Sequence, residues 1–304
     1  MLDTTKNRLY KNKSIFTLII LSLLIIYGCG ENNVTNNNGH DPTIDSLYIG
    51  TDTTLDVMTW NIEHFPKQGD ATVETVIEII RELDLDMIVM QEIESEAAFD
   101  EIVEALEAWE GYRSTGAAYD INLAVIYNTE HLTVDNINNI FSDDWWAFPR
   151  TPQVIDCYYN GENYVVINNH LKAGGGSENE ERRLAASESL KVYMDDNYPN
   201  KRVILLGDLN DSLTDSESEN VFWQFISDST NYQFADMAIA KGSISRWSYP
   251  SWPSHLDHIL ITNELFEAWE SGSTMTLLLD DYYEDYQYTV SDHRPVLIKL
   301  DTDL

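Results

Sequence analysis

The chain has 304 residues, with 52 acidic against 18 basic side chains, so its formal charge is −34 at pH 7. That length allows one large domain or two small ones, with a sizeable hydrophobic core. A surface this negative repels polyanions and argues against a general nucleic-acid-coating role. Chemistry on phosphates stays open where a metal ion supplies the positive charge.

The first 29 residues combine a basic start, an apolar run and a cysteine. Four basic residues precede an apolar run over residues 15–27, which is shorter than a membrane span and matches the core of a secretory signal. The run leads into Ile-Tyr-Gly-Cys, which resembles a lipoprotein processing site, although Tyr27 is larger than the usual residue. We expect a lipoprotein-type signal peptide over residues 1–28. Its removal, with four basic residues and one acidic residue, would change the charge from −34 to −37.

Cys29 would then be the lipidated first residue, which predicts attachment to the outer membrane or cell surface of a bacterium. An uncleaved signal anchor and a plain secretory signal are the alternatives. Residues 29–54 are polar and rich in Asn, so we expect a flexible tether there. Cys157 would have no disulfide partner and is interpreted as a small core residue.

Residues 55–304 show neither a repeat nor an internal boundary, so we expect one catalytic domain, a monomer without an inferred protein partner. We predict strands near residues 55–61, 87–90, 112–114, 123–127, 153–159, 164–168, 203–206, 256–262 and 296–300. We predict helices after a cap at Asp70, over 96–109, from the Gly-rich loop at 174–176 to about 196, and after a Ser216-x-x-Glu219 capping box. This alternation of strands and helices predicts an α/β fold.

Polar side chains stand at the ends of six predicted strands. They are Asn61, Glu92, His170, Asp208 with Asn210, Asp257, and Asp292 with His293. Each alone is compatible with an ordinary turn, a solvated strand end or a hydrogen-bonded histidine. Taken as an ordered series, they indicate one functional site at the ends of the strands.

The segments that contain these residues resemble the motifs of the endonuclease/exonuclease/phosphatase superfamily, the DNase I-like metal-dependent phosphohydrolases. The matching segments are Thr59-Trp-Asn-Ile62, Val89-Met-Gln-Glu92, Asn168-Asn-His-Leu171, Leu206-Gly-Asp-Leu-Asn210, Leu256-Asp-His-Ile259 and Val290-Ser-Asp-His-Arg-Pro295. They span nearly all of residues 55–300. The resemblance implies a four-layer α/β sandwich, in which two packed mixed β-sheets are flanked by helices and the site lies at one end.

The resemblance also implies a metal centre. Glu92 would be the main ligand, with Asn61 beside it and Asp292 near the metal or the water. Bare carboxylates would repel a phosphate, so a divalent cation must lie between them. Oxygen-rich ligation without sulfur favours Mg²⁺, with Mn²⁺ or Ca²⁺ as substitutes.

The catalytic roles are likewise implied by the resemblance. Asp208 would orient or deprotonate the attacking water, and Asn210 would hydrogen-bond the phosphate or the nucleophile. Asp257 would orient His293. His293 and His170 would contact the phosphate, and one of them would protonate the leaving oxygen.

Substrate contacts are expected from Tyr119, Arg150, Lys172 and Arg246. Tyr119 could donate to a phosphate oxygen, and Asp120 stands where some nucleases place an acidic partner for the first histidine. Aromatic loops over residues 143–151, 246–252 and 280–286 could stack on bases, insert into a membrane interface or fold back onto the core.

Residues 169–176 and the following Arg182-Arg183 look like the corresponding segment of bacterial extracellular nucleases, without the cysteines that some of them carry. We therefore expect a membrane-anchored, metal-dependent phosphodiesterase, a nuclease that hydrolyses DNA or RNA by in-line attack of water. One alternative is a sphingomyelinase-like lipid or inositol-phosphate hydrolase of the same superfamily. A more remote one is a catalytically silent Ca²⁺-binding surface protein.

Overall fold

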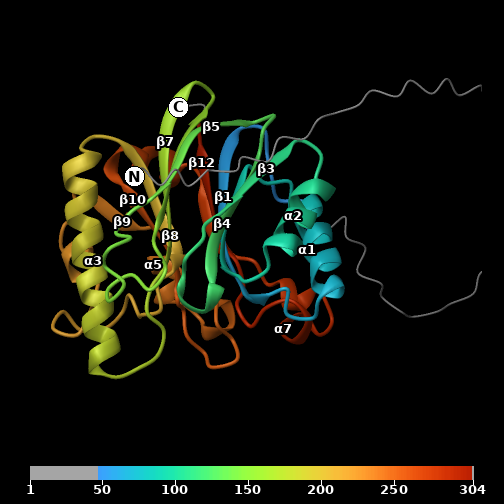
Figure 1. The fold of residues 1–304 in the computed structure, drawn as a ribbon. Helices are drawn as coiled ribbons and strands as arrows, with labels where there is room; N and C mark the ends of the chain where they lie inside the picture. The colour runs from blue at the N-terminus through green and yellow to red at the C-terminus, as the bar shows by residue number, and fades with distance from the viewer. Residues whose placement is uncertain (1–46, 303–304) are drawn as a thin grey trace, which may run out of the picture.

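The computed structural model describes residues 47–302, so the predicted signal peptide, Cys29 and most of the predicted tether lie outside the described residues. Two β-sheets pack face to face, with α1 and α2 on the outer side of one sheet and α3 on the outer side of the other (Figure 1). This arrangement confirms the predicted four-layer α/β sandwich. Within residues 47–302 no helix combines the length and hydrophobicity needed to cross a bilayer.

The first sheet has six strands in the order β11-β12-β1-β2-β4-β3. Only β1 and β2 pair in parallel, and the other neighbours are antiparallel. The strands are β1 (Thr54–Phe65), β2 (Met87–Ile93), β3 (Trp109–Arg113), β4 (Asn122–Asn128), β11 (Ser273–Thr276) and β12 (Val296–Asp301).

The second sheet also has six strands, in the order β5-β6-β7-β8-β10-β9. Its one parallel pair is β7 with β8. The strands are β5 (Leu132–Asn139), β6 (Gln153–Tyr159), β7 (Glu162–His170), β8 (Arg202–Asp208), β9 (Tyr232–Phe234) and β10 (Asp257–Thr262).

The helices bury two further layers of apolar side chains. The α-helices are α1 (Asp70–Leu83), α2 (Glu96–Ala105), α3 (Ser177–Asn197), α4 (Trp223–Ile226), α5 (Met237–Ala240), α6 (Phe266–Glu270) and α7 (Tyr286–Thr289). One core joins α1 and α2 to the first sheet, a second lies between the sheets, and a third joins α3 to the second sheet. Strand alternation produces this layering, because successive side chains point to opposite faces. In β1, Leu55 and Val57 face the other sheet, whereas Met58 and Trp60 face the helices.

Several element boundaries differ from those predicted. Leu47 is buried in the core and the amide of Gly50 bonds to the carbonyl of Leu83, so the packed domain begins before residue 55. Asp70 does not cap α1, which follows Gly69 without a side-chain cap. Ser216 and Glu219 form a turn, in which the N–H of Glu219 donates to the carbonyl of Ser216 and Ser216 Oγ donates to Glu219 Oε2, in place of the reciprocal bonds of the predicted capping box, and the next helix is only α4.

Candidate active site

The same alternation that builds the inter-sheet core places the polar residues at its end. Asn61 continues the inward face of β1 after Val57, and Asp208 continues that of β8 after Leu206. Asp257 opens β10 directly opposite Asp208 in the antiparallel ladder. Since the two sheets contribute different residues, the site lies where both sheets end.

Gly207 allows the second sheet to bring His170 beside Asp208. These two residues are register partners in the parallel β7–β8 pair. Gly207 has φ of +146°, and a Cβ atom there would lie 1.9 Å from the carbonyl oxygen of Asn169. A residue without a side chain is therefore required for the close approach of the two strands.

Asp208 is the group on which the site converges. Its Oδ2 atom lies 2.9 Å from Asn61 Nδ2, 3.5 Å from His170 Nε2 and 3.9 Å from His293 Nε2. Its other oxygen accepts from the backbone N–H of Asn210 at 3.1 Å. The carboxylate is buried, so these neighbours replace the water that would otherwise solvate it.

Glu92 reaches the same place through an irregularity in β2. Simple alternation would point its side chain toward the helices, but its φ of +65° and a register shift at this point redirect it. Glu92 Oε1 lies 3.3 Å from Asn61 Nδ2 and 3.8 Å from His170 Nε2. Glu92 and Asp208 therefore flank one amide, although they come from different sheets.

His293 is held by a buried carboxylate. Its Nδ1 lies 2.7 Å from Asp257 Oδ2, which leaves Nε2 directed toward Asp208. The ring of Tyr249 packs on the imidazole, with 4.8 Å between centroids. The backbone of His293 is fixed as well, because its N–H donates to Ser291 Oγ and its carbonyl accepts from Tyr286.

The buried charges set the protonation states of the site. Burial raises the pKa of Asp208 to about 7, against the opposing effect of His293. Burial alone would lower the pKa of His293, but Asp257 and Asp208 override it and raise that pKa to about 10. Burial holds the pKa of His170 well below its usual value, with Arg150 acting in the same direction. At neutral pH the structure therefore favours a protonated His293 and a neutral His170.

Asn210 and Asp292 occupy the rim of this group. Asn210 has φ of +57° and donates from Nδ2 to the carbonyl of Leu171, so it leaves the strand geometry that ends at Asp208. Asp292 Oδ1 lies 3.9 Å from His293 Nε2, and its N–H donates to Glu63 Oε2. Sequence reasoning assigned no role to Glu63. The available signal was its position two residues after Asn61 in β1.

A polar network lies between the sheets directly beneath the site. Gln91 Nε2 donates to Asn168 Oδ1 at 2.8 Å, across the gap from one sheet to the other. Asn168 Nδ2 in turn donates to the carbonyls of Met90 and Ala124 and to Gln153 Oε1. Because Gln91 precedes Glu92 and Asn168 lies two residues before His170, the network anchors both flanks of the site.

The donor set fits a hard divalent cation. Oxygen atoms of Glu92 and Asp208 face one space beside Asn61, and buried Asp257 Oδ1 has no hydrogen-bond partner among residues 47–302. Ligand atoms of Asp208, Asp257 and His293 also lie within 4.8 Å of one another. We favour the oxygen set, since the pKa of His293 is raised to about 10, so its Nε2 carries a proton at neutral pH and cannot bind a metal. The amide nitrogen of Asn61 faces the carboxylates, so in this structure Asn61 orients them.

Two of the four expected substrate-binding residues adjoin the site. Arg150 Nη1 lies 3.4 Å from the carbonyl of Leu171, the carbonyl that Asn210 also contacts. Lys172 follows Leu171 and lies near enough to Arg150 for the two charges to interact. These two cations therefore line the flank of the site formed by β7 and the loop after β8.

The structure does not bring the other two candidates into contact with the site. Tyr119 is 92% exposed and has φ of +59°. Arg246 is exposed, and its guanidinium has no ion-pair or hydrogen-bond partner within the described part of the chain. Asp120 pairs with Arg113 at 3.0 Å and does not meet His170, whose Nδ1 has no partner among the described residues.

A second buried cluster lies behind β10. Asp236 Oδ2 accepts from His258 at 2.6 Å and lies 3.0 Å from His255 Nε2. The remaining nitrogen of His258 lies 2.9 Å from the carbonyl of Asp211. Both nitrogens of His258 thus face acceptors, so this ring is a buried cation paired with Asp236. Every polar side-chain atom of Asp236 and His258 has a hydrogen-bond partner, so a structural role accounts for this pair.

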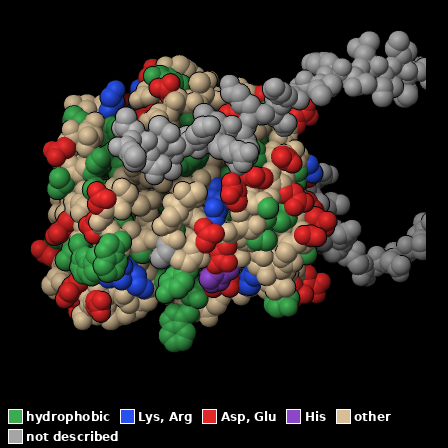
Figure 2. Space-filling model, in the orientation of Figure 1, with side chains coloured by type: hydrophobic (Ala, Val, Ile, Leu, Met, Phe, Trp, Pro, Cys, Tyr) green, Lys and Arg blue, Asp and Glu red, His purple; other side chains and the backbone are tan. Residues whose placement is uncertain are grey.

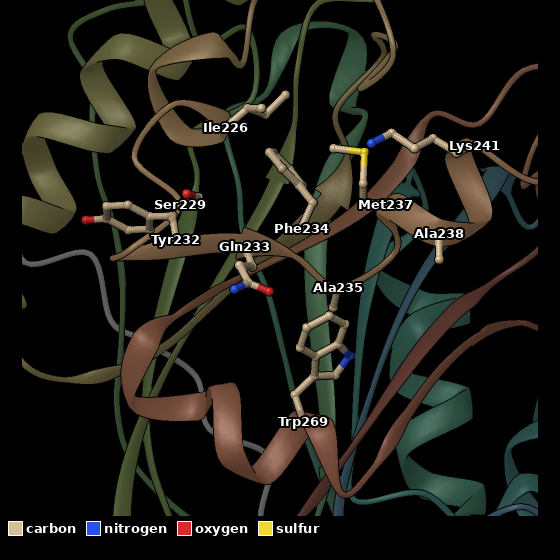
Figure 3. Close-up of a pocket in the computed structure, with 10 residues that line it drawn as sticks. All are labelled: Ile226, Ser229, Tyr232, Gln233, Phe234, Ala235, Met237, Ala238, Lys241 and Trp269. Atoms are coloured by element: carbon tan, nitrogen blue, oxygen red, sulfur yellow. The ribbon is translucent and has the colours of Figure 1, made fainter.

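A cavity of about 510 Å³ lies elsewhere, around the short edge strand β9 (Figure 3). Its walls are largely apolar, with Phe234 and Met237 on one side and Trp269 on the other. It shares no lining residue with the group around Asp208. The cavity therefore supplies no charged group to the chemistry of the site.

The two-sheet sandwich, with carboxylates, amides and imidazoles at one end, is a DNase I-like architecture. A model of the Endonuclease/Exonuclease/phosphatase family matches residues 58–293, and the chain belongs to that family. Comparison with curated proteins finds no match.

Solved structures show the same fold at low sequence identity. TDP2 of D. rerio, complexed with single strand DNA product, has a TM-score of 0.61 at 12% identity and covers 83% of this chain and 100% of its own. An endonuclease/exonuclease/phosphatase from Bacteroides vulgatus has a TM-score of 0.61 at 15% identity, with 82% and 98% covered. The human Nocturnin catalytic domain, with bound sulfate anion, has a TM-score of 0.59 at 18% identity, with 81% and 94% covered.

Proposed function

We propose that this protein is a metal-dependent phosphodiesterase that cleaves nucleic acid by attack of water on a phosphate. The observation that carries the proposal is the convergence on Asp208 of Asn61, His170 and His293, with Glu92 beside the same amide. A buried carboxylate among two imidazoles and a second carboxylate is costly to a fold and suited to phosphate chemistry.

The residues of the chain divide the work by their protonation and position. Asp208 accepts a hydrogen bond from the attacking water, since its carboxylate is buried and faces the space between the sheets. His293, held by Asp257 and protonated, donates to a phosphoryl oxygen or to the leaving oxygen. His170, neutral, donates one N–H to the phosphate. A divalent cation bound by Glu92 and Asp208 would supply charge neutralisation at the phosphoryl oxygens.

Nucleic acid is the substrate that we favour. The flank formed by Arg150 and Lys172 offers positive charge in a chain of formal charge −34. The related fold of D. rerio TDP2 is known with a single strand DNA product, which adds support by analogy. Phosphate contacts of this kind also predict that binding weakens with salt.

A substrate panel tests the proposal. Single-stranded DNA, duplex DNA, RNA, sphingomyelin vesicles and inositol phosphates should each be incubated with Mg²⁺, Mn²⁺ or Ca²⁺, alongside Asp208→Asn as the inactive control. We expect cleavage of a nucleic acid by the wild type and none by the variant. Hydrolysis of sphingomyelin or inositol phosphate without cleavage of any nucleic acid would replace the proposed substrate. Equal activity in Asp208→Asn would reject the mechanism.

The membrane attachment at Cys29 is a separate part of the proposal and rests on the sequence of residues 1–29. It is tested by fractionating cells that express the wild type or Cys29→Ala. Lipidation predicts that the wild type sediments with membranes and that the variant is released. Retention of both proteins in the membrane fraction would contradict it.

A further inference from the structure

A pair of exposed tryptophans lies on the loop that follows β5, four and five residues before Arg150. Trp145 is 74% exposed and Trp146 is 37% exposed. Exposure of two adjacent indoles is costly in water, because each could bury a large apolar area. The loop that carries them is nevertheless well held, since Asp144 Oδ1 accepts from the N–H of Ala147 and Phe148 is buried beneath it.

Arg182 of α3 fixes the position of these indoles. Its Nε donates to the carbonyl of Trp146 at 2.6 Å and its Nη2 to that of Trp145 at 3.4 Å. The guanidinium carbon lies 6.0 Å from the centroid of the Trp146 ring. The guanidinium of Arg182 thus lies against a face of the Trp146 ring. The Trp145 ring stays open to solvent.

Hydrogen bonds hold α3, the helix that carries Arg182, against the loops that follow β7 and β8. The next residue, Arg183, is buried, and its Nε donates to Asp211 Oδ2 at 2.7 Å. Its Nη1 donates to the carbonyls of Lys172 and Gly174. Asp211 and Lys172 follow closely on Asn210 and His170, so the indoles have a defined position relative to the site.

Basic side chains lie between the loop that carries the two tryptophans and the group around Asp208. The charges of Arg150, Arg182 and Arg183 all act on Lys172, so these four cations lie together. Arg150 also lies close enough to Glu92 and Asp208 to interact with both. Hydrophobic and basic side chains adjoin over the lower half of α3 (Figure 2). Arg182, which bonds to the backbone of both tryptophans, also lies near enough to Arg150 for their charges to interact.

We propose that Trp145, Trp146 and Arg182 form a stacking subsite for an unpaired nucleobase next to the scissile phosphate, with Lys172 and Arg150 on the phosphates between. This inference rests on the proposed function and adds a preference for single-stranded substrate. Stacking needs an accessible base face, which a single strand offers and a duplex hides. A base on Trp145 also leaves the two neighbouring carboxylates, Asp143 and Asp144, in water.

Those carboxylates disfavour a lipid bilayer as the occupant. Asp143 and Asp144 are exposed and directly precede Trp145, so insertion of the indole would carry both toward the membrane. Arg182 is engaged with the loop backbone and cannot neutralise them there. We therefore commit to a nucleic-acid strand and make the membrane an outcome of the test.

The test measures binding without cleavage. The affinity of a short labelled single-stranded oligonucleotide is determined by fluorescence anisotropy with Mg²⁺ present, together with quenching of tryptophan fluorescence, for the full chain carrying His293→Gln to prevent cleavage. We expect Trp145→Ala to weaken binding by roughly tenfold, in line with the effect of removing one stacked base. The matched control is Tyr158→Ala, whose exposed ring lies at the other end of the second sheet, and it should leave the affinity unchanged.

Further measurements separate the outcomes. Duplex DNA should bind Trp145→Ala and its parent protein equally, and Lys172→Ala should reduce the dependence of oligonucleotide affinity on salt. Unchanged oligonucleotide affinity in Trp145→Ala, or an equal loss for duplex, would overturn the subsite. So would loss of binding to phosphatidylcholine vesicles with no loss for the oligonucleotide. Because all of these variants are compared in a His293→Gln background that does not turn over substrate, the results are independent of whether the protein cleaves nucleic acid.

Discussion

The imidazole of His293 and the carboxylate of Asp257 are joined by a contact of 2.7 Å between Nδ1 and Oδ2, and both residues are buried. The contact orients the ring, stabilises its protonated form and leaves Nε2 directed toward Asp208. His293 and Asp257 come from different sheets, since one precedes β12 and the other begins β10. The active imidazole therefore depends on correct packing of the whole sandwich.

Asp257→Asn should lower kcat by roughly 10²–10⁴-fold, because the amide neither stabilises an imidazolium nor guarantees the same tautomer. The measurement is hydrolysis of a small phosphodiester, with circular dichroism to confirm folding. The amide preserves the shape of the side chain, so the β8–β10 ladder should survive. Activity within a few-fold of the wild type would show that His293 does not need its carboxylate partner.

Removal of divalent metal should abolish hydrolysis, and Mg²⁺ or Mn²⁺ should restore it. Cation binding should also stabilise the fold, by about 2.7 kcal/mol at a concentration of about 100 times Kd. Urea unfolding with and without Mg²⁺ measures this gain directly. We expect Glu92→Gln to lose most of the gain, because a neutral amide is a poor ligand for a hard cation. An equal gain in wild type and Glu92→Gln would place the cation elsewhere.

Gly207→Ala should destabilise the protein by about 2–4 kcal/mol, since a Cβ atom at 1.9 Å from the Asn169 carbonyl must push β7 and β8 apart. His170 and Asp208 would separate with the strands, so activity should fall more than stability alone explains. Gly161→Ala is the matched control. Gly161 has φ of +82° but open space around it, so this change should cost only about 1 kcal/mol. Similar losses of stability in both variants would show that the positive φ, and not the close contact with Asn169, causes the effect.

Asp236→Asn should destabilise the fold by about 3–5 kcal/mol near pH 5, because it leaves the His258 cation buried without its partner. His258 and Asp236 each shift the pKa of the other. Burial alone would lower the pKa of His258, but the charge of Asp236 raises it. Burial alone would raise the pKa of Asp236, but His258 and His255 lower it. The pair therefore contributes its full stabilisation of the fold between the pKa values that the two side chains have in the unfolded chain, about 4 for Asp and about 6.5 for His.

This stabilisation should decline above that window as pH rises through the folded pKa of His258, and below it as pH falls through that of Asp236. Urea unfolding across pH 4–9 tests the expectation. The difference between wild type and Asp236→Asn should be largest near pH 5 and smaller at pH 9. A difference that does not vary with pH would mean that His258 is neutral.

Strand alternation made much of the fold and the site predictable from sequence. The inward-facing apolar positions of β1, β8 and β10 are continued in alternation by Asn61, Asp208 and Asp257, so a local pattern predicts the direction of these three side chains. The family motifs add the order of the strands, which local patterns do not contain. Strands β9 and β11 were missed, because three or four residues give too little alternation to recognise, and the longer β5 was missed because most of its side chains are polar.

Other parts of the site depend on contacts between distant segments. Glu92 faces the site only because β2 is irregular, and its residue type does not reveal a positive φ. Asp120 was expected near His170, but Arg113 lies closer and attracts it. Arg182 and Trp146 lie 36 positions apart in the chain, and no periodicity connects them.

The amide pair of Gln91 and Asn168 has a consequence for how the enzyme can be controlled. It joins the two sheets where water cannot reach, so sliding or opening of the sandwich would break hydrogen bonds that nothing replaces. Half of the catalytic groups belong to each sheet, and they are therefore assembled before any substrate arrives. Opening of the two halves would therefore cost the free energy of these buried hydrogen bonds. Under the proposed function, the surface loops and the supply of metal are the places where the rate would be controlled.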